Sequence, residues 1–137
     1  MGRRVLIAIT GASGSIYPAQ MIEKLLQLTD QWEALSVVAT DNAMDVWQVE
    51  MQAPFEKKEG IAYFDKNDFS APFASGSGQY DTMIIAPCSM GALGRIANGI
   101  SNDLITRAAV AAEMFAVDGI QTVMNRYNPE TTAPEVD

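Results

Sequence analysis

The sequence of 137 residues contains no histidine and a single cysteine, Cys88. Without histidine, the chain has neither a Ser-His nor a Cys-His catalytic pair, and it lacks the commonest zinc ligand. One cysteine excludes an internal disulfide and is typical of a reducing compartment, so we expect a cytoplasmic protein with Cys88 in its core. Chemistry therefore depends on carboxylates, hydroxyls, arginine or a bound cofactor, and we expect no metal site.

Basic residues and long apolar segments are also scarce. Nine Lys and Arg stand against 17 Asp and Glu, which gives a formal net charge of −8. Nucleic-acid binding needs clustered Lys and Arg, so we expect no nucleic-acid partner. No apolar run approaches the roughly 20 residues of a membrane-spanning helix, so we expect no membrane association. With 48% hydrophobic residues, the length suits one domain, residues 1–137.

Short apolar, β-branched runs alternate with helical patterns along the chain. This alternation predicts an α/β fold, a Rossmann-like (flavodoxin-like) three-layer sandwich with a parallel sheet that binds ligands at the carboxyl ends of its strands. Expected strands cover 4–10, 34–40, 61–64, 81–87 and 119–124. Expected helices cover 17–28, 41–51 with Thr40, Asp41 or Asn42 as N-cap, 89–97 with Ser89 as N-cap, and 101–117 with Ser101 or Asn102 as N-cap.

The segment "TGASG" joins the first expected strand to the first helix. Such a turn directs free backbone N–H groups and the positive end of a helix dipole at one point, which suits a single phosphate, although a plain tight turn fits as well. The dinucleotide fingerprint GxGxxG is absent, no Gly-Lys-Ser/Thr follows for a P-loop, and the Tyr-x-x-x-Lys pair of short-chain dehydrogenases is missing. A mononucleotide remains the favoured ligand.

Three segments together carry a family resemblance. In their order and spacing, "ITGASGSIY", "APFASGSG" and "DTMIIAPCSMGALGRIANGISNDLITRAA" resemble the flavin prenyltransferases, the UbiX-like branch of the homo-oligomeric flavoprotein decarboxylases, formerly called aromatic acid decarboxylases. The resemblance implies FMN as the cofactor and a homo-oligomer. It also implies transfer of a dimethylallyl group from dimethylallyl phosphate to N5 and C6 of reduced FMN, which then serves a UbiD-type decarboxylase.

The resemblance also implies which residues do this. Ser13 would lie near the flavin N5, Thr40 on the FMN phosphate, and Glu50 in the proton transfer, with Tyr127 near the substrate phosphate. The implied sets are catalytic Ser13, Glu50 and Tyr127, cofactor-binding Gly11, Ala12, Ser13, Thr40, Ser89, Met90 and Arg107, and substrate-binding Ser75, Gly76, Ser77 and Arg107.

The sequence departs from the family pattern after Ala109. Val110 replaces an aspartate, and residues 111–131 resemble a later family segment. The resemblance therefore implies that residues 110–137 are shortened by about one βα unit, which in the family carries the Lys, Arg and Glu that hold and protonate the substrate phosphate. Two alternatives follow. A non-catalytic FMN-binding or assembly module would keep the cofactor and lose the reaction. The second alternative is a flavin-dependent cysteine decarboxylase of the same superfamily. That branch characteristically has a histidine base, which this chain does not have.

Overall fold

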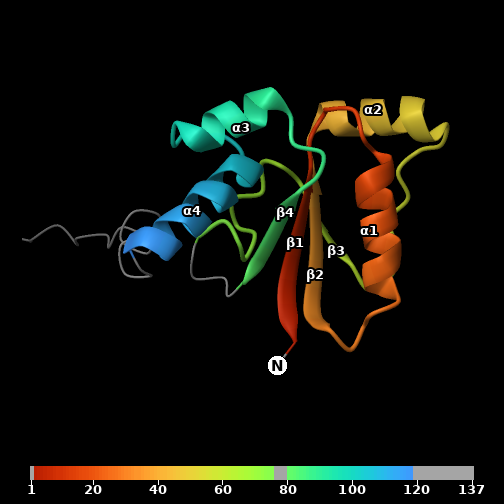
Figure 1. Cartoon of the computed structure of the whole chain (residues 1–137), viewed down its shortest axis with the longest axis horizontal. Coiled ribbons are helices and arrows are strands. Elements are labelled where there is room, and N and C mark those ends of the chain that lie inside the picture. The colour runs from red at the N-terminus through yellow and green to blue at the C-terminus, as the bar shows by residue number, and fades with distance from the viewer. Residues whose placement is uncertain (1, 76–79, 119–137) are drawn as a thin grey trace, which may run out of the picture.

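The computed structural model describes residues 2–75 and 80–118, and for 112–118 the backbone alone. Strands and helices alternate in the first part of the chain, and two helices close the described part (Figure 1). The elements are β1 (Arg3–Ile9), α1 (Ile16–Leu26), β2 (Trp32–Ala39), α2 (Asp41–Met51), β3 (Ala62–Phe64), β4 (Thr82–Ile85), α3 (Met90–Ala97) and α4 (Leu104–Asp118).

The four described strands form one parallel sheet in the order β3-β2-β1-β4. This order corresponds to the first four strands of the doubly wound order 3-2-1-4-5-6. The chain adds β2 and β3 on one side of β1 and then places β4 on the other side, so the direction of winding reverses between β1 and β4. In such sheets ligands bind outside the carboxyl ends of the strands at this reversal.

Helices cover both faces of the sheet (Figure 1). On one face, Ile22 of α1 and Trp47 of α2 belong to a buried cluster with alternate residues of β1. On the other face, Leu104 of α4 and Phe73 of the connection between β3 and β4 form a second cluster with Leu6 and Ala8 of β1. The predicted three-layer α/β sandwich with a parallel sheet is therefore confirmed.

The central strands are more buried than the outer strand β4. Val5 to Ile9 of β1 are all buried, as expected for a strand covered on both faces. β4 is only half-buried along its length, because it lies at the edge of the described sheet. Cys88 follows β4 and is exposed, so its expected place in the core is wrong: the chain has already left the sheet at Pro87.

Helix ends agree with the local sequence signals in part. Thr40 caps α2 and Ser89 caps α3, and their side chains accept the N–H groups of Ala43 and Ala92. The prediction of Ser101 or Asn102 as the N-cap of α4 is wrong. The cap is Asp103, whose carboxylate accepts the Thr106 N–H at 2.8 Å. The expected strand 119–124 lies outside the described residues. No helix within the described ranges is long and apolar enough to cross a bilayer.

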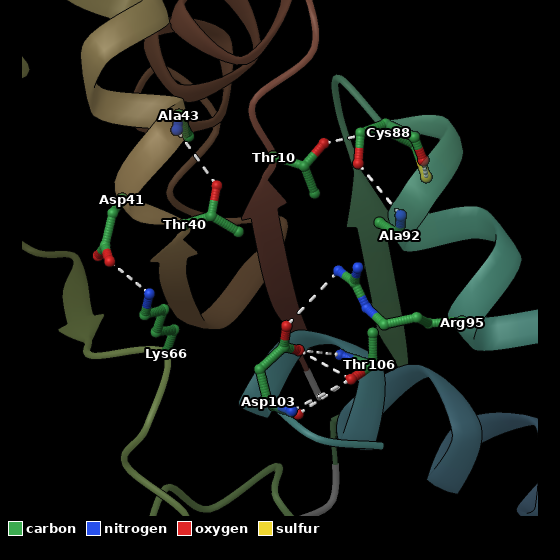
Figure 2. Close-up of polar contacts among 11 residues, drawn as sticks. Thr10, Thr40, Asp41, Ala43, Lys66, Cys88, Ala92, Arg95, Asp103 and Thr106 are labelled. Atoms are coloured by element: carbon green, nitrogen blue, oxygen red, sulfur yellow. Dashed lines mark hydrogen bonds and ion pairs between the residues drawn. The ribbon is translucent and has the colours of Figure 1, made fainter. Parts of the chain in front are cut away.

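Thr10 joins the end of β1 to the turn that precedes α3 (Figure 2). Its hydroxyl donates to the Pro87 carbonyl at 2.6 Å and accepts the Ser89 N–H at 2.8 Å. The Thr10 side chain is buried, with 2% of the residue exposed. One hydroxyl therefore fixes the two turns on either side of the reversal point.

We predict that Thr10→Val lowers the free energy of unfolding by about 1–3 kcal/mol, because the Ser89 N–H loses its acceptor. Thr10→Ser keeps the hydroxyl and removes only a methyl group, so it should cost about 0.8 kcal/mol. Urea denaturation of the three proteins measures both values. A serine variant as unstable as the valine variant would contradict the role of the hydroxyl.

Candidate functional site

Two turns meet at the reversal point of the sheet. The first follows β1 and contains the glycine-rich segment 11–14, and the second follows β4 and leads through Ser89 into α3. Gly14 lies beside the second turn, since a Cβ on this residue would be 3.6 Å from Cβ of Pro87. The turn predicted from "TGASG" therefore lies where a doubly wound sheet binds its ligand.

Glycine suits two positions of the first turn for different structural reasons. A Cβ at Gly11 would lie 2.7 Å from Cβ of Asn42, so the turn touches the first turn of α2. Gly14 has φ +121°, a conformation that residues with a side chain rarely adopt. Gly11 thus permits the close approach of the turn to α2, and Gly14 permits the backbone conformation with which the chain enters α1.

The N–H groups at the start of α1 are bound to a carboxylate of the protein itself. Oε2 of Glu50 accepts the N–H groups of Gly14 at 3.0 Å and Ser15 at 2.8 Å, and the Ser13 hydroxyl donates to Oε1. The turn does hold an anion, as its geometry predicts. That anion is Glu50 and not a phosphate, so the sequence-based assignment of a phosphate to this turn is replaced by a carboxylate from α2.

These hydrogen bonds favour the ionised form of Glu50. The Ser13 hydroxyl, followed by the N–H groups of Ser15 and Gly14, lowers the pKa of Glu50 from 4.5 to about 2. Near neutral pH, Glu50 is therefore an anion that holds the Ser13 proton toward itself. A charged carboxylate hydrogen-bonded to a hydroxyl is an arrangement that can move a proton to or from a ligand placed above it.

An open cleft of about 630 Å³ lies over this pair. Ser13, Gly14 and Glu50 supply its polar part, and the side chains of Ile16, Tyr17 and Met51 supply its apolar part. The volume lies in the usual range of ligand pockets, and the lining combines apolar side chains with a few polar groups. Such a cleft suits a flat aromatic ring with a polar edge.

Other predicted cofactor residues lie at neighbouring helix starts. Thr40 directly precedes α2 and its hydroxyl oxygen serves as the N-cap (Figure 2). Ser89 precedes α3 and caps it in the same way. Met90, directly after Ser89, is 83% exposed. Ala12 lies in the same turn as Gly11 and Ser13. The structure thus brings Ser13 and Glu50 into contact and places Thr40, Ser89 and Met90 along the same edge of the sheet.

Arg107 contacts the loop that leads to the predicted substrate residues. Its Nε donates to the carbonyl of Ala74 at 2.9 Å, and its guanidinium lies 5.5 Å from the centre of the Phe69 ring. Ser75 follows directly and is half-buried. Gly76, Ser77 and Tyr127 lie outside the described residues, so their predicted roles stay predictions.

Sequence reasoning missed two ion pairs at this edge (Figure 2). Lys66, after β3, pairs with Asp41 at the start of α2, and this hydrogen bond raises the pKa of Lys66. Arg95 of α3 pairs with Asp103 at 3.7 Å. A signal for Arg95 was present, since it is the one charged residue in the α3 sequence MGALGRIA.

A parallel sheet with this order and with polar groups at its reversal point is the architecture of doubly wound α/β proteins, many of which bind nucleotide-type cofactors at this place. The chain belongs to the Flavoprotein family, whose profile matches residues 1–127.

Relatives and solved structures give the same assignment. The chain is 34% identical to flavin prenyltransferase UbiX of Methanocaldococcus jannaschii, over 76% of this chain and 55% of the relative, and 37% identical to that of Thermoplasma acidophilum, over 80% and 59%. AnUbiX, solved with FMN and dimethylallyl pyrophosphate, superposes with TM-score 0.70 at 30% identity, over 85% of this chain and 60% of the other. The chain thus spans less than two thirds of these proteins.

We predict that Glu50 stabilises the fold in a pH-dependent way. A pKa lowered from 4.5 to about 2 means that the contribution is complete above 4.5 and is lost as the pH falls toward 2. Glu50→Gln removes this titration, so the stability difference between wild type and variant should shrink over that interval. Urea unfolding at several pH values measures it, with the exposed Glu56→Gln as matched control. A difference that stays constant with pH would contradict the assignment.

Proposed function

We propose that the chain binds FMN at the carboxyl edge of its sheet and acts as a flavin prenyltransferase. The observation that carries this proposal is the hydrogen-bonded pair of Ser13 and Glu50 at the floor of an open, partly apolar cleft. Family membership and the UbiX relatives support the same activity. Residues 1–137 would form the single FMN-binding domain.

The residues present fit FMN. The apolar side chains of Ile16, Tyr17 and Met51 suit the isoalloxazine ring, and the Ser13 hydroxyl can reach a ring nitrogen at its edge. Thr40 and Ser89, at two neighbouring helix starts, suit the ribityl and phosphate groups. In the proposed site these residues and Arg107 hold the cofactor, and Ser75, Gly76, Ser77 and Tyr127 contribute to the donor's binding.

When bound and reduced, FMN would supply the nucleophilic N5 and C6 and an aromatic surface beside the allylic carbon. The chain's own residues have three tasks in this proposal. Ser13 and Glu50 hold and move a proton at the flavin edge, because the ionised carboxylate can accept it through the hydroxyl. The apolar side chains of Ile16, Tyr17 and Met51 provide a surface for the flavin ring and the allyl group. The positive charge of Arg107, the cation of the implied substrate-binding set, stabilises the departing phosphate.

A related structure supports an oligomeric assembly. A UbiX-like structure from Escherichia coli O157:H7 is described as dodecameric and FMN-dependent, with TM-score 0.71 at 25% identity over 80% of this chain and 60% of the other. We therefore propose a homo-oligomer for this chain. A UbiD-type decarboxylase is the proposed recipient of the product. The cytoplasmic location stays a prediction from the sequence.

We expect the purified protein to carry FMN through gel filtration and to bind added FMN in a fluorescence titration at micromolar concentration. Riboflavin serves as a comparison that keeps the ring and lacks the phosphate. The experiment checks the cofactor independently of catalysis. Absence of binding at micromolar FMN would overturn the proposal.

We further expect wild-type protein with reduced FMN to form a prenylated flavin from dimethylallyl phosphate or dimethylallyl pyrophosphate. Ser13→Ala and Glu50→Gln should slow this reaction by about 10²- to 10⁴-fold, the usual contribution of a placed proton-transfer group. Glu56→Gln is the matched control and should leave the rate unchanged. Mass spectrometry of the released flavin gives the readout. Tight FMN binding with no adduct would favour the non-catalytic binding module instead.

A further inference from the structure

We infer that Arg95 binds the phosphate group of a phosphate monoester ligand at the carboxyl edge of the sheet. This inference rests on the proposed function, because it names a further ligand-binding residue of that site. Neither the glycine turn nor the three segments that resemble the prenyltransferases assign a role to Arg95. Two phosphates have the required chemistry, that of FMN and that of the dimethylallyl donor.

The position of Arg95 brings its charge to the ligand edge. The residue lies near the end of α3, which follows β4 on the outer side of the reversal point. Its side chain runs back along the helix, because Nη1 lies 3.5 Å from the place that a Cβ at Gly91 would occupy. The guanidinium is directed from α3 toward the start of α4 (Figure 2). The charge of Arg95 therefore lies beside Gly91, near the first turn of α3.

The donors of Arg95 are poorly used by the part of the chain that the structure describes. Nε is buried and has no hydrogen-bond partner there. Nη2 lies 3.7 Å from Oδ2 of Asp103, well beyond the 2.7–2.9 Å of a charge-assisted hydrogen bond. By contrast, Arg4, whose side chain is as exposed as that of Arg95, makes two hydrogen bonds to Glu33, at 3.2 and 2.8 Å. A half-buried guanidinium with free donors points to an acceptor that is supplied by a ligand.

The hydrogen bonds of Asp103 leave Arg95 able to bind a ligand. Its Oδ1 accepts both the N–H and the hydroxyl of Thr106, each at 2.8 Å, and so caps α4. Its Oδ2 faces Arg95. Arg95 can therefore turn to a phosphate without the cap of α4 being lost. A planar guanidinium with parallel N–H groups can bind two phosphate oxygens at once, whereas its present contact to Asp103 is a single one at 3.7 Å.

The test compares ligands with and without phosphate in three variants. Arg95→Gln removes the charge, Arg95→Lys keeps it, and Asp103→Asn removes the competing charge while asparagine still caps α4. If Arg95 binds the FMN phosphate, Arg95→Gln should weaken FMN binding by about 10-fold or more, as expected for a hydrogen bond to a charged group. The affinity of this variant for riboflavin should stay within about 2-fold of the wild-type value, because riboflavin has no phosphate for Arg95 to bind. Arg95→Lys should give an intermediate value, and Asp103→Asn should tighten FMN binding.

A second titration with dimethylallyl phosphate, followed by calorimetry, separates the two sources of phosphate. Loss of affinity for this donor in Arg95→Gln, with FMN binding unchanged, would assign Arg95 to the donor phosphate. Circular dichroism and thermal unfolding confirm that each variant is folded. If Arg95→Gln binds both phosphates as the wild type does, the inference is overturned and the proposed function stands. If Asp103→Asn weakens binding as Arg95→Gln does, the pair is structural and the inference is likewise overturned. Wild-type protein that binds no flavin would instead overturn the proposed function.

Discussion

The carboxylate of Glu50 holds together the elements on which the site depends. Helix α2 touches the glycine turn at both of its ends: Asn42 in its first turn lies against Gly11, and Glu50 in its last turn binds the N–H groups of Gly14 and Ser15. The turn is therefore fixed by steric contact at one end and by charge at the other. The negative charge also complements the positive end of the α1 dipole. The shape of the cleft and the direction of the Ser13 hydroxyl both follow from this arrangement.

Signals that act over a few residues were sufficient for much of the fold. The β-branched run of β1 and the caps at Thr40 and Ser89 depend on neighbours within one turn, so the sequence predicted them correctly. The prediction of the α4 N-cap was wrong because three residues that favour this position follow one another, Ser101, Asn102 and Asp103. Only packing decides which of them caps the helix. The prediction that Cys88 is buried was wrong because the residue type indicates burial only on average. Its exposure depends on where the chain turns after β4.

The site needed information from residues far apart in the sequence. Ser13 and Glu50 are 37 positions apart, and the resemblance placed both near a flavin without showing that they bind each other. The parallel sheet was predictable from the alternation of strands and helices, but the order β3-β2-β1-β4 was not. That order decides which turns meet, and hence that the turn after β1 lies beside Pro87. Pairings such as Arg95 with Asp103 follow from it.

Charge is arranged in a regular way at the carboxyl edge, although the chain has a net charge of −8. An aspartate is the first residue of α2 and another directly precedes α4, and each pairs with a cation from another element: Asp41 with Lys66, and Asp103 with Arg95. The two glycines of the first turn have a genetic consequence. Alanine at Gly11 collides mainly with the Asn42 side chain, so Asn42→Gly would act as a second-site suppressor. Alanine at Gly14 is opposed by its own backbone angle, and no change elsewhere in the chain would rescue it.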